Sequence, residues 1–174
     1  YINVKSIKEA GNMDKESFEQ VSARMTAHWN NLEKLSRLHL TLHDYSGFIK
    51  VSPEDNLMEG INYHRTACCK FHGNTHKSCI AHRAIGAKLR AAEEKGAFTM
   101  SCWAGVKELV VPLYLGNDLA ATVFAGVFRD GEFDVSSMPR GYRKLYKALP
   151  LWDESRKEEL ESVLVAAGYA MLKI

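Results

Sequence analysis

The chain of 174 residues lacks several features that would narrow its function at once. No apolar run approaches the roughly 18 residues that a membrane-spanning helix needs, and no signal peptide opens the chain. Neither sign of charge dominates, because 23 Lys and Arg residues stand against 21 Asp and Glu residues. The basic residues are dispersed along the sequence rather than gathered in one run. Neither nucleic acid nor an anionic membrane is therefore the default partner of this chain.

Signatures of catalysis are missing as well. We find no glycine-rich phosphate loop, no pair of carboxylates suited to acid–base work and no known nucleophile motif around a cysteine. The four cysteines would permit two disulfides, but the other marks of a small secreted scaffold are absent. We therefore expect reduced thiols in a cytoplasmic protein that is not an enzyme and carries no cofactor.

The most informative feature that is present is a concentration of cysteine and histidine between Tyr63 and Trp103. This stretch holds all four cysteines and four of the seven histidines. Soft, polarizable side chains gathered in one quarter of a small protein indicate a site rather than random core filling. Its members are Cys68, Cys69, Cys79, Cys102, His64, His72, His76 and His82.

Three interpretations of this stretch stay open. Cys69, Cys79 and Cys102, with one more ligand, could hold zinc or an iron–sulfur cluster, although the spacing lacks the paired short knuckles of typical zinc sites. The cysteines could instead be small buried core residues. That explains Ser101–Gly105 less well, because a thiol, an indole and two small residues there interrupt a strand pattern, as they would around a recessed ligand cavity.

Hydrophobic periodicity predicts an α+β fold. Apolar residues recur at helical spacing from Asp14 to Ser36, with Asn12 or Asp14 as the N-cap, and again beyond an Asp153 cap. A helix over 77–95 is expected to end at Gly96, and a short helix is expected over 142–149. The remaining pattern alternates with a period of two and predicts five strands, over 38–42, 48–51, 98–102, 108–115 and 120–128.

No strand–helix–strand alternation calls for a parallel sheet, so one five-stranded antiparallel sheet with covering helices is expected. Residues 1–174 form a single domain, with an N-terminal helix over 12–36, a core over 38–134 and a C-terminal helix over 153–174. The chain starts at Tyr1 and ends in a helical pattern, so we expect it to be one domain of a longer protein. The apolar stripes of the two terminal helices form either a homodimer seam or a face buried on their own sheet.

The ordered cysteines also carry a resemblance. Cys69-Lys70-Phe71, then Cys79 and a helix, then Cys102-Trp103-Ala104-Gly105-Val106 and a strand with Pro112, resemble the PocR-type sensory domain. The strand from Leu119 to Phe128, with Gly126, is similar to a glycine-containing strand of that family. The resemblance implies a PAS-like sensory module joined to an AraC-type helix-turn-helix or to a histidine kinase in a bacterial regulator. It also implies a ligand related to small hydrocarbon derivatives such as propanediols.

On this basis we expect a cavity for a diol or polyol, formed where residues distant in sequence meet. Cys69, Cys79, Cys102 and Trp103 are expected to line it, with a polar contact from Tyr63 or His64 and with Phe124 closing it from the sheet. The C-terminal helix would pass the signal on. DNA would be contacted only through an output domain outside this chain, and no membrane contact is expected.

Overall fold

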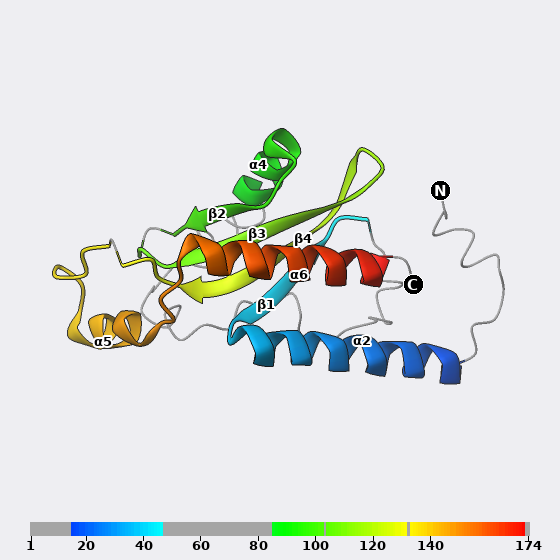
Figure 1. Ribbon diagram of the computed structural model, residues 1–174, viewed down its shortest axis with the longest axis horizontal. Helices are drawn as coiled ribbons and strands as arrows, with labels where there is room; N and C mark the ends of the chain where they lie inside the picture. The colour runs from blue at the N-terminus through cyan, green and yellow to red at the C-terminus, as the bar shows by residue number, and fades with distance from the viewer. Residues whose placement is uncertain (1–14, 47–84, 103, 132, 173–174) are drawn as a thin grey trace.

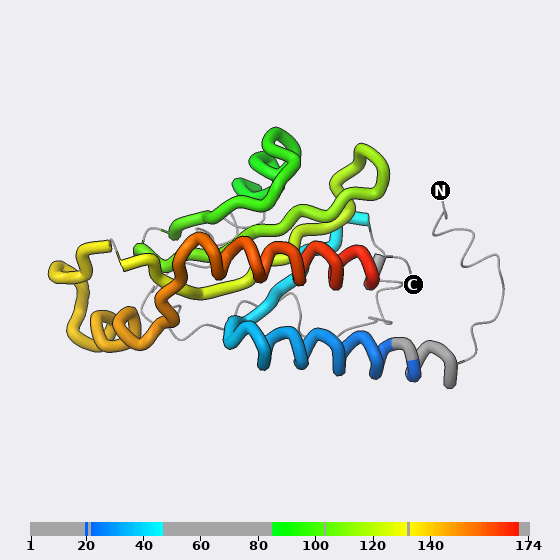
Figure 2. The backbone as a smooth tube through the Cα atoms, viewed as in Figure 1, coloured from blue at the N-terminus to red at the C-terminus, as the bar shows by residue number. Residues whose placement is uncertain are grey.

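The computed structural model describes residues 15–46, 85–102, 104–131 and 133–172. Figure 1 shows the elements, and Figure 2 traces the same backbone as a tube. In chain order the elements are α2 (Lys15–Ser36), β1 (His39–Asp44), α4 (Ala87–Glu94), β2 (Phe98–Ser101), β3 (Lys107–Leu115), β4 (Asp118–Phe128), α5 (Arg140–Ala148) and α6 (Glu154–Leu172). The α+β class is confirmed. Within the described ranges, no helix is both long enough and apolar enough to cross a membrane.

The described strands form one antiparallel sheet in the order β1-β4-β3-β2. A two-residue turn at Gly116-Asn117 joins β3 to β4, with Leu115 paired to Asp118 and Gly116 at a φ of +64°. Glycine reaches that φ at little cost, which suits it to the tight hairpin turn between these two strands. The expected fifth strand over 48–51 lies outside the described residues.

One face of the sheet carries the main core, under α2 and α6. Met25 and Trp29 of α2 pack there with Leu160 and Leu164 of α6, and all four are at most 8% exposed. The Trp29 indole N–H also donates a hydrogen bond to the backbone oxygen of Leu40, at 3.3 Å. The predicted stripes of both terminal helices therefore bury against their own sheet at these positions.

Two of the predicted helix ends can be compared with the structure. Asp153 caps α6 as expected, because its Oδ1 accepts a hydrogen bond from the backbone N–H of Arg156 at 2.9 Å. The end of α4 differs from the prediction by one residue. Lys95, not Gly96, takes the left-handed conformation, at a φ of +54°, and donates its N–H to the Ala91 carbonyl. The sequence favours glycine for this conformation, but a helix end can shift by one residue with little change in energy.

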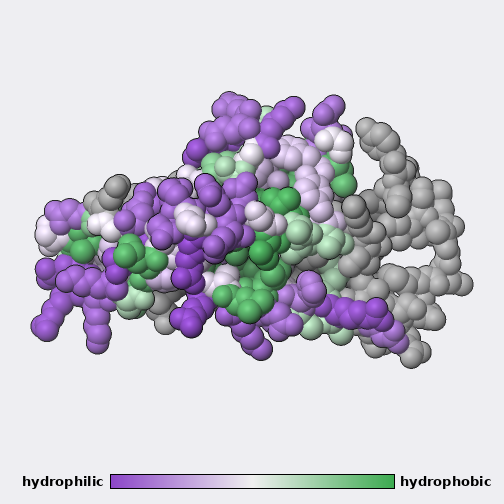
Figure 3. Space-filling model, viewed as in Figure 1, coloured by the Kyte–Doolittle hydropathy of each residue, from purple (hydrophilic) through white to green (hydrophobic). Residues whose placement is uncertain are grey.

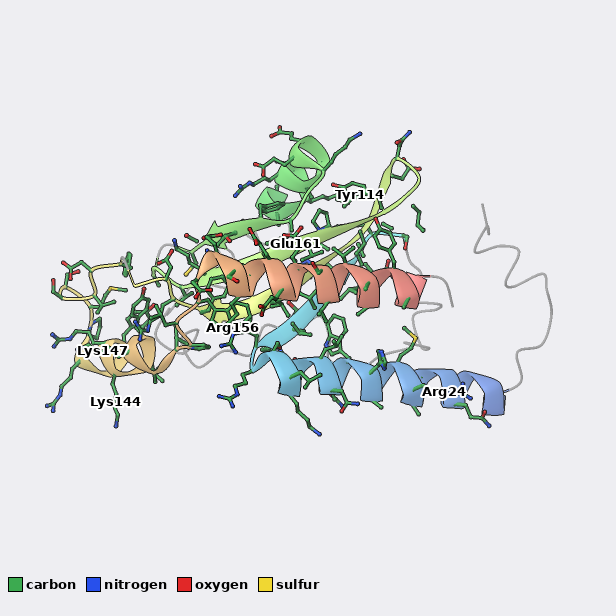
Figure 4. All side chains as sticks on the ribbon, viewed as in Figure 1. Arg24, Tyr114, Lys144, Lys147, Arg156 and Glu161 are labelled. Atoms are coloured by element: carbon green, nitrogen blue, oxygen red, sulfur yellow. The ribbon has the colours of Figure 1, made fainter. Side chains whose placement is uncertain are left out.

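The short helix α5 is fixed to one end of the sheet by two tyrosines. Tyr142 and Tyr146 are buried in a second apolar cluster with Ala104, Val106 and Val127. The opposite side of α5 is exposed and basic, and Figure 4 shows two of its lysines extending away from the body of the molecule. The expectation of dispersed basic residues is wrong here, because the exposed side gathers Arg140, Arg143, Lys144 and Lys147.

A close contact between α6 and the sheet gives a first stability prediction. A Cβ at Gly168 would lie 2.5 Å from Cδ1 of Leu113, which is fully buried. Gly168→Ala is therefore expected to lower the free energy of unfolding by about 1–3 kcal/mol, despite the better helix propensity of alanine. Urea unfolding checks this. Gly96→Ala is the control, because its Cβ would meet only the Glu94 carbonyl oxygen, at 3.9 Å. Equal losses in both variants would contradict the packing argument.

Candidate functional site

The second face of the sheet, here called the α4 face, combines an apolar centre with buried polar groups. Side chains alternate along each strand, so Leu40 and Leu42 of β1 join the main core while Thr41 and His43 lie on the opposite face. Phe124 and Val110 occupy the centre of the α4 face, on neighbouring strands. They pack with Phe98, Met100 and two alanines of α4, Ala87 and Ala91.

Two threonines on this face are fully buried. Thr41 is 1% exposed and Thr122 is 0% exposed. The Thr122 hydroxyl lies 2.9 Å from the Tyr45 hydroxyl, at hydrogen-bonding distance. Burial raises the pKa of Tyr45 above its ordinary value, and the hydrogen bond to Thr122 opposes that rise. The His43 ring lies 4.8 Å from the Phe124 ring. Polar groups therefore border the central phenylalanine on the β1 side.

A buried carboxylate borders the same apolar centre on the β3 side. Glu108 is 5% exposed and pairs across the sheet with Gly126. A Cβ at Gly126 would lie only 2.6 Å from Cγ of Glu108, so the missing side chain is what lets the glutamate lie across β4. A register shift also occurs here, between Lys107 and Glu108. The close approach of Glu108 and the register shift are typical of a glycine inside a strand.

The structure places two of the predicted site residues. Phe124 lies at the centre of the α4 face and is fully buried. Cys102 follows β2, is partly buried and packs with the α5 cluster rather than with Phe124. The other predicted residues, Tyr63, His64, Cys69, Cys79 and Trp103, lie outside the described residues. The meeting of three thiols around one hollow therefore stays a prediction.

The small residues Ala104 and Gly105, which follow Cys102, have a structural role in a turn. Cys102 N–H donates to the Val106 carbonyl and Gly105 N–H to the Cys102 carbonyl, each at 2.9 Å. The fully buried Ala104 accepts a hydrogen bond from the Tyr142 hydroxyl at 2.5 Å, and its N–H donates to the Cys102 sulfur at 3.4 Å. Gly105 has a φ of +76°, and a Cβ added at this position would clash with the Phe133 ring. This part of the motif thus builds a tight turn that docks α5.

Sequence reasoning missed the polar members of the α4 face. The alternation in β1 predicted a half-buried strand, but Thr41 is buried on the side assigned to solvent. The almost continuous apolar run from Ala120 to Phe128, which contains Thr122, was the available signal that both faces of β4 are covered. Among the described residues, no three His, Cys, Asp or Glu side chains gather closely enough to hold a metal ion. The metal alternative, at Cys69, Cys79 and Cys102, falls mostly outside them.

Comparison with known families supports a sensory role. A family model described as the sensory domain found in PocR matches residues 22–167, which is most of the chain. No curated protein and no solved structure gives a significant match. The matched region includes the whole sheet, the α4 face and most of both terminal helices.

Proposed function

The chain belongs to the PocR sensory-domain family, and from this premise we propose that it binds a small diol or polyol on the α4 face of its sheet. We further propose that it does so as a PAS-like, non-enzymatic, cytoplasmic module of a bacterial transcriptional regulator or signalling protein. The observation that carries the proposed site is the burial of Thr41, Thr122 and Glu108 around Phe124. An apolar site with a few convergent polar groups is the usual form of a small-molecule pocket.

The chemistry of this face suits a very small hydroxylated ligand. Phe124 and Val110 are fully buried, so a ligand here would occupy an enclosed space that these two side chains line with apolar groups. The threonine hydroxyls can donate or accept hydrogen bonds, and the carboxyl oxygens of the glutamate can accept them from ligand hydroxyls. Tiny ligands gain at most about 1.5 kcal/mol per non-hydrogen atom, so a five-atom diol reaches at most about 7.5 kcal/mol. That corresponds to a dissociation constant of about 3 µM at best.

We propose that the predicted residues outside the described ranges complete the pocket. Tyr63, His64, Cys69, Cys79 and Trp103 would approach from the segments before α4 and after β2. Cys102 would contribute less than the sequence indicated, because it packs with the α5 cluster.

The signal would travel through the strands to α6. Val110 and Phe124 face the ligand, whereas Val111 and Val123, next to them in sequence, pack in the core under α6. A ligand that binds one arrangement of these strands better than another would shift the packing of α6. The homodimer expected from the terminal helices would place α6 of both protomers near one interface. An AraC-type helix-turn-helix or a histidine kinase would read the shift, and DNA would be contacted only there.

A thermal-shift screen of small diols and polyols tests the ligand class. A ligand at about 100 times its dissociation constant stabilises the folded state by about 2.7 kcal/mol, which raises the melting temperature of a protein of this size by about 5–10 °C. Absence of any shift across the panel at tens of millimolar would contradict the proposed ligand class.

Thr122→Val tests the proposed location. The variant keeps the size of the side chain and removes one hydroxyl, so we expect affinity for a diol hit to fall by about threefold to tenfold. Calorimetric titration measures this. Thr99→Val is the matched control. Thr99 is a partly exposed residue of β2, and it alternates with Phe98 and Met100, whose side chains lie on the α4 face. Equal effects of both variants would contradict the location.

Metal analysis distinguishes the diol-sensor proposal from the alternative function, a metal- or redox-sensing domain that uses the cysteine–histidine stretch. Protein purified without added metal would then contain stoichiometric zinc or iron. The diol proposal expects neither.

A further inference from the structure

An open apolar groove runs between the C-terminal turn of α2 and the N-terminal half of α6. Its volume is about 460 Å³, and its apolar lining comes from Leu32, Leu35, Leu160 and Val163. Figure 3 shows hydrophobic residues gathered on this side of the molecule, over the region between the two helices. Leu35 is 80% exposed and Val163 is 48% exposed. Large aliphatic side chains that share one exposed groove are typical of an interaction surface.

In the described parts of the two terminal helices, Leu35 and Val163 are large apolar residues that the molecule's own core leaves uncovered. Met25, Trp29 and Leu164 face the sheet and are nearly inaccessible to solvent. Leu35 and Val163 stand on the flanks of their helices, where the sheet does not reach them. Among the described residues, the two interpretations of the stripes therefore divide by position: the positions that face the sheet are buried, and the flank that faces the groove is open to a partner.

We propose that the occupant of this groove is a second copy of the chain, related by a two-fold axis. The charges at the rim favour this occupant. Arg156 and Glu159 both border the groove and are both exposed, so the rim carries both signs. In a two-fold interface the same patch meets itself, so Arg156 of one protomer can pair with Glu159 of the other, twice. Arg156 lies 5.1 Å from the Trp152 ring, and Figure 4 shows it on the side of α6 that faces α2.

The size of the surface indicates a weak, reversible dimer. The 19 residues of α6 span about 28 Å, and two adjacent helices are about 20 Å wide. The whole face would thus offer at most about 560 Å² per protomer, and the groove covers only its part beside the N-terminal half of α6. Even the whole face is below the roughly 800 Å² per partner of standard stable interfaces. We expect a monomer–dimer equilibrium in the micromolar range or weaker. This proposal concerns the unliganded protein and does not depend on the diol site.

Sedimentation of the 174-residue chain from about 5 to 500 µM tests the inference. We expect the weight-average mass to rise with concentration. Leu35→Glu is expected to weaken the dimer at least tenfold without unfolding the protein, because Leu35 is almost fully exposed. Leu89→Glu is the matched control, because Leu89 is 62% exposed on α4 and away from the groove.

A charge exchange tests the two-fold geometry. Arg156→Glu alone and Glu159→Arg alone each place like charges opposite one another and should raise the dissociation constant. The double variant Arg156→Glu/Glu159→Arg should restore dimerisation, because the pairs are re-formed with the signs exchanged. Circular dichroism confirms that each variant is folded. A strict monomer at 500 µM would overturn the proposal, and so would a dimer that is indifferent to Leu35→Glu and to both single charge changes.

Discussion

Gly105→Ala is expected to lower the free energy of unfolding by about 3 kcal/mol or more. Two costs combine at this position. A φ of +76° strains any residue with a Cβ, by about 1–2 kcal/mol. The added Cβ would also lie 2.1 Å from Cγ of Phe133, so the ring must leave its place beside Tyr146. Forced repacking of this kind costs about 1–3 kcal/mol. Urea unfolding followed by tryptophan fluorescence measures the sum.

Gly131→Ala separates the two costs. Gly131 also has a positive φ, of +90°, but a Cβ there would meet only Cδ1 of Leu151, at an ordinary 3.7 Å. This variant should lose the strain energy alone and remain more stable than Gly105→Ala. Phe133→Leu in the Gly105→Ala background should recover part of the loss. If Gly131→Ala is as damaging as Gly105→Ala, the turn does not depend on the contact with Phe133.

Gly126→Ala is expected to cost about 2–3 kcal/mol and to disturb the proposed site. The new Cβ would lie 2.6 Å from Cγ of Glu108 and 3.2 Å from the Lys107 carbonyl oxygen. The glutamate would then be pushed from its buried position, which overpacks the strand and removes a polar group from the α4 face. Urea unfolding reports the stability, and calorimetry with a diol hit reports the expected loss of affinity.

The double variant Gly126→Ala/Glu108→Ala identifies the cause. Removing Cγ of Glu108 removes the closest clash. The double variant should therefore lose less stability than the sum of the losses of the two single variants. Affinity for the diol should stay low, because the carboxylate is gone. Strict additivity of the two stability losses would show that Gly126 and Glu108 do not pack against each other as described.

Much of the fold could be predicted because its signals are local. The alternating pattern of the first strand and the Asp153 cap each act within a few residues. The cap is found at the predicted residue, and the strand predicted over 38–42 is found over His39–Asp44. The ends of elements were less certain. Lys95 rather than Gly96 closes α4, since a helix end can shift by one residue with little change in energy.

The candidate site was harder to predict because its burial is not local. Thr41 looked like the solvent side of a strand, and only the packing of distant segments makes it inaccessible. Glu108 looked like a charged strand start, and the glycine that accommodates it lies 18 positions later. Helical periodicity likewise could not separate Leu160, which faces the sheet, from Val163 on the flank of the same helix. Phe124 lies at the centre of the α4 face, and its role in closing a pocket stays a prediction.

The central claim is that a small hydroxylated molecule binds the α4 face. A titration of ¹⁵N-labelled protein with a diol hit, followed by amide chemical shifts, tests it most directly. The account predicts saturable shifts concentrated at Thr41, Glu108, Val110, Thr122 and Phe124, with smaller changes along α6. Saturable shifts confined to other surfaces, such as α5 or the groove beside Leu35, would contradict it.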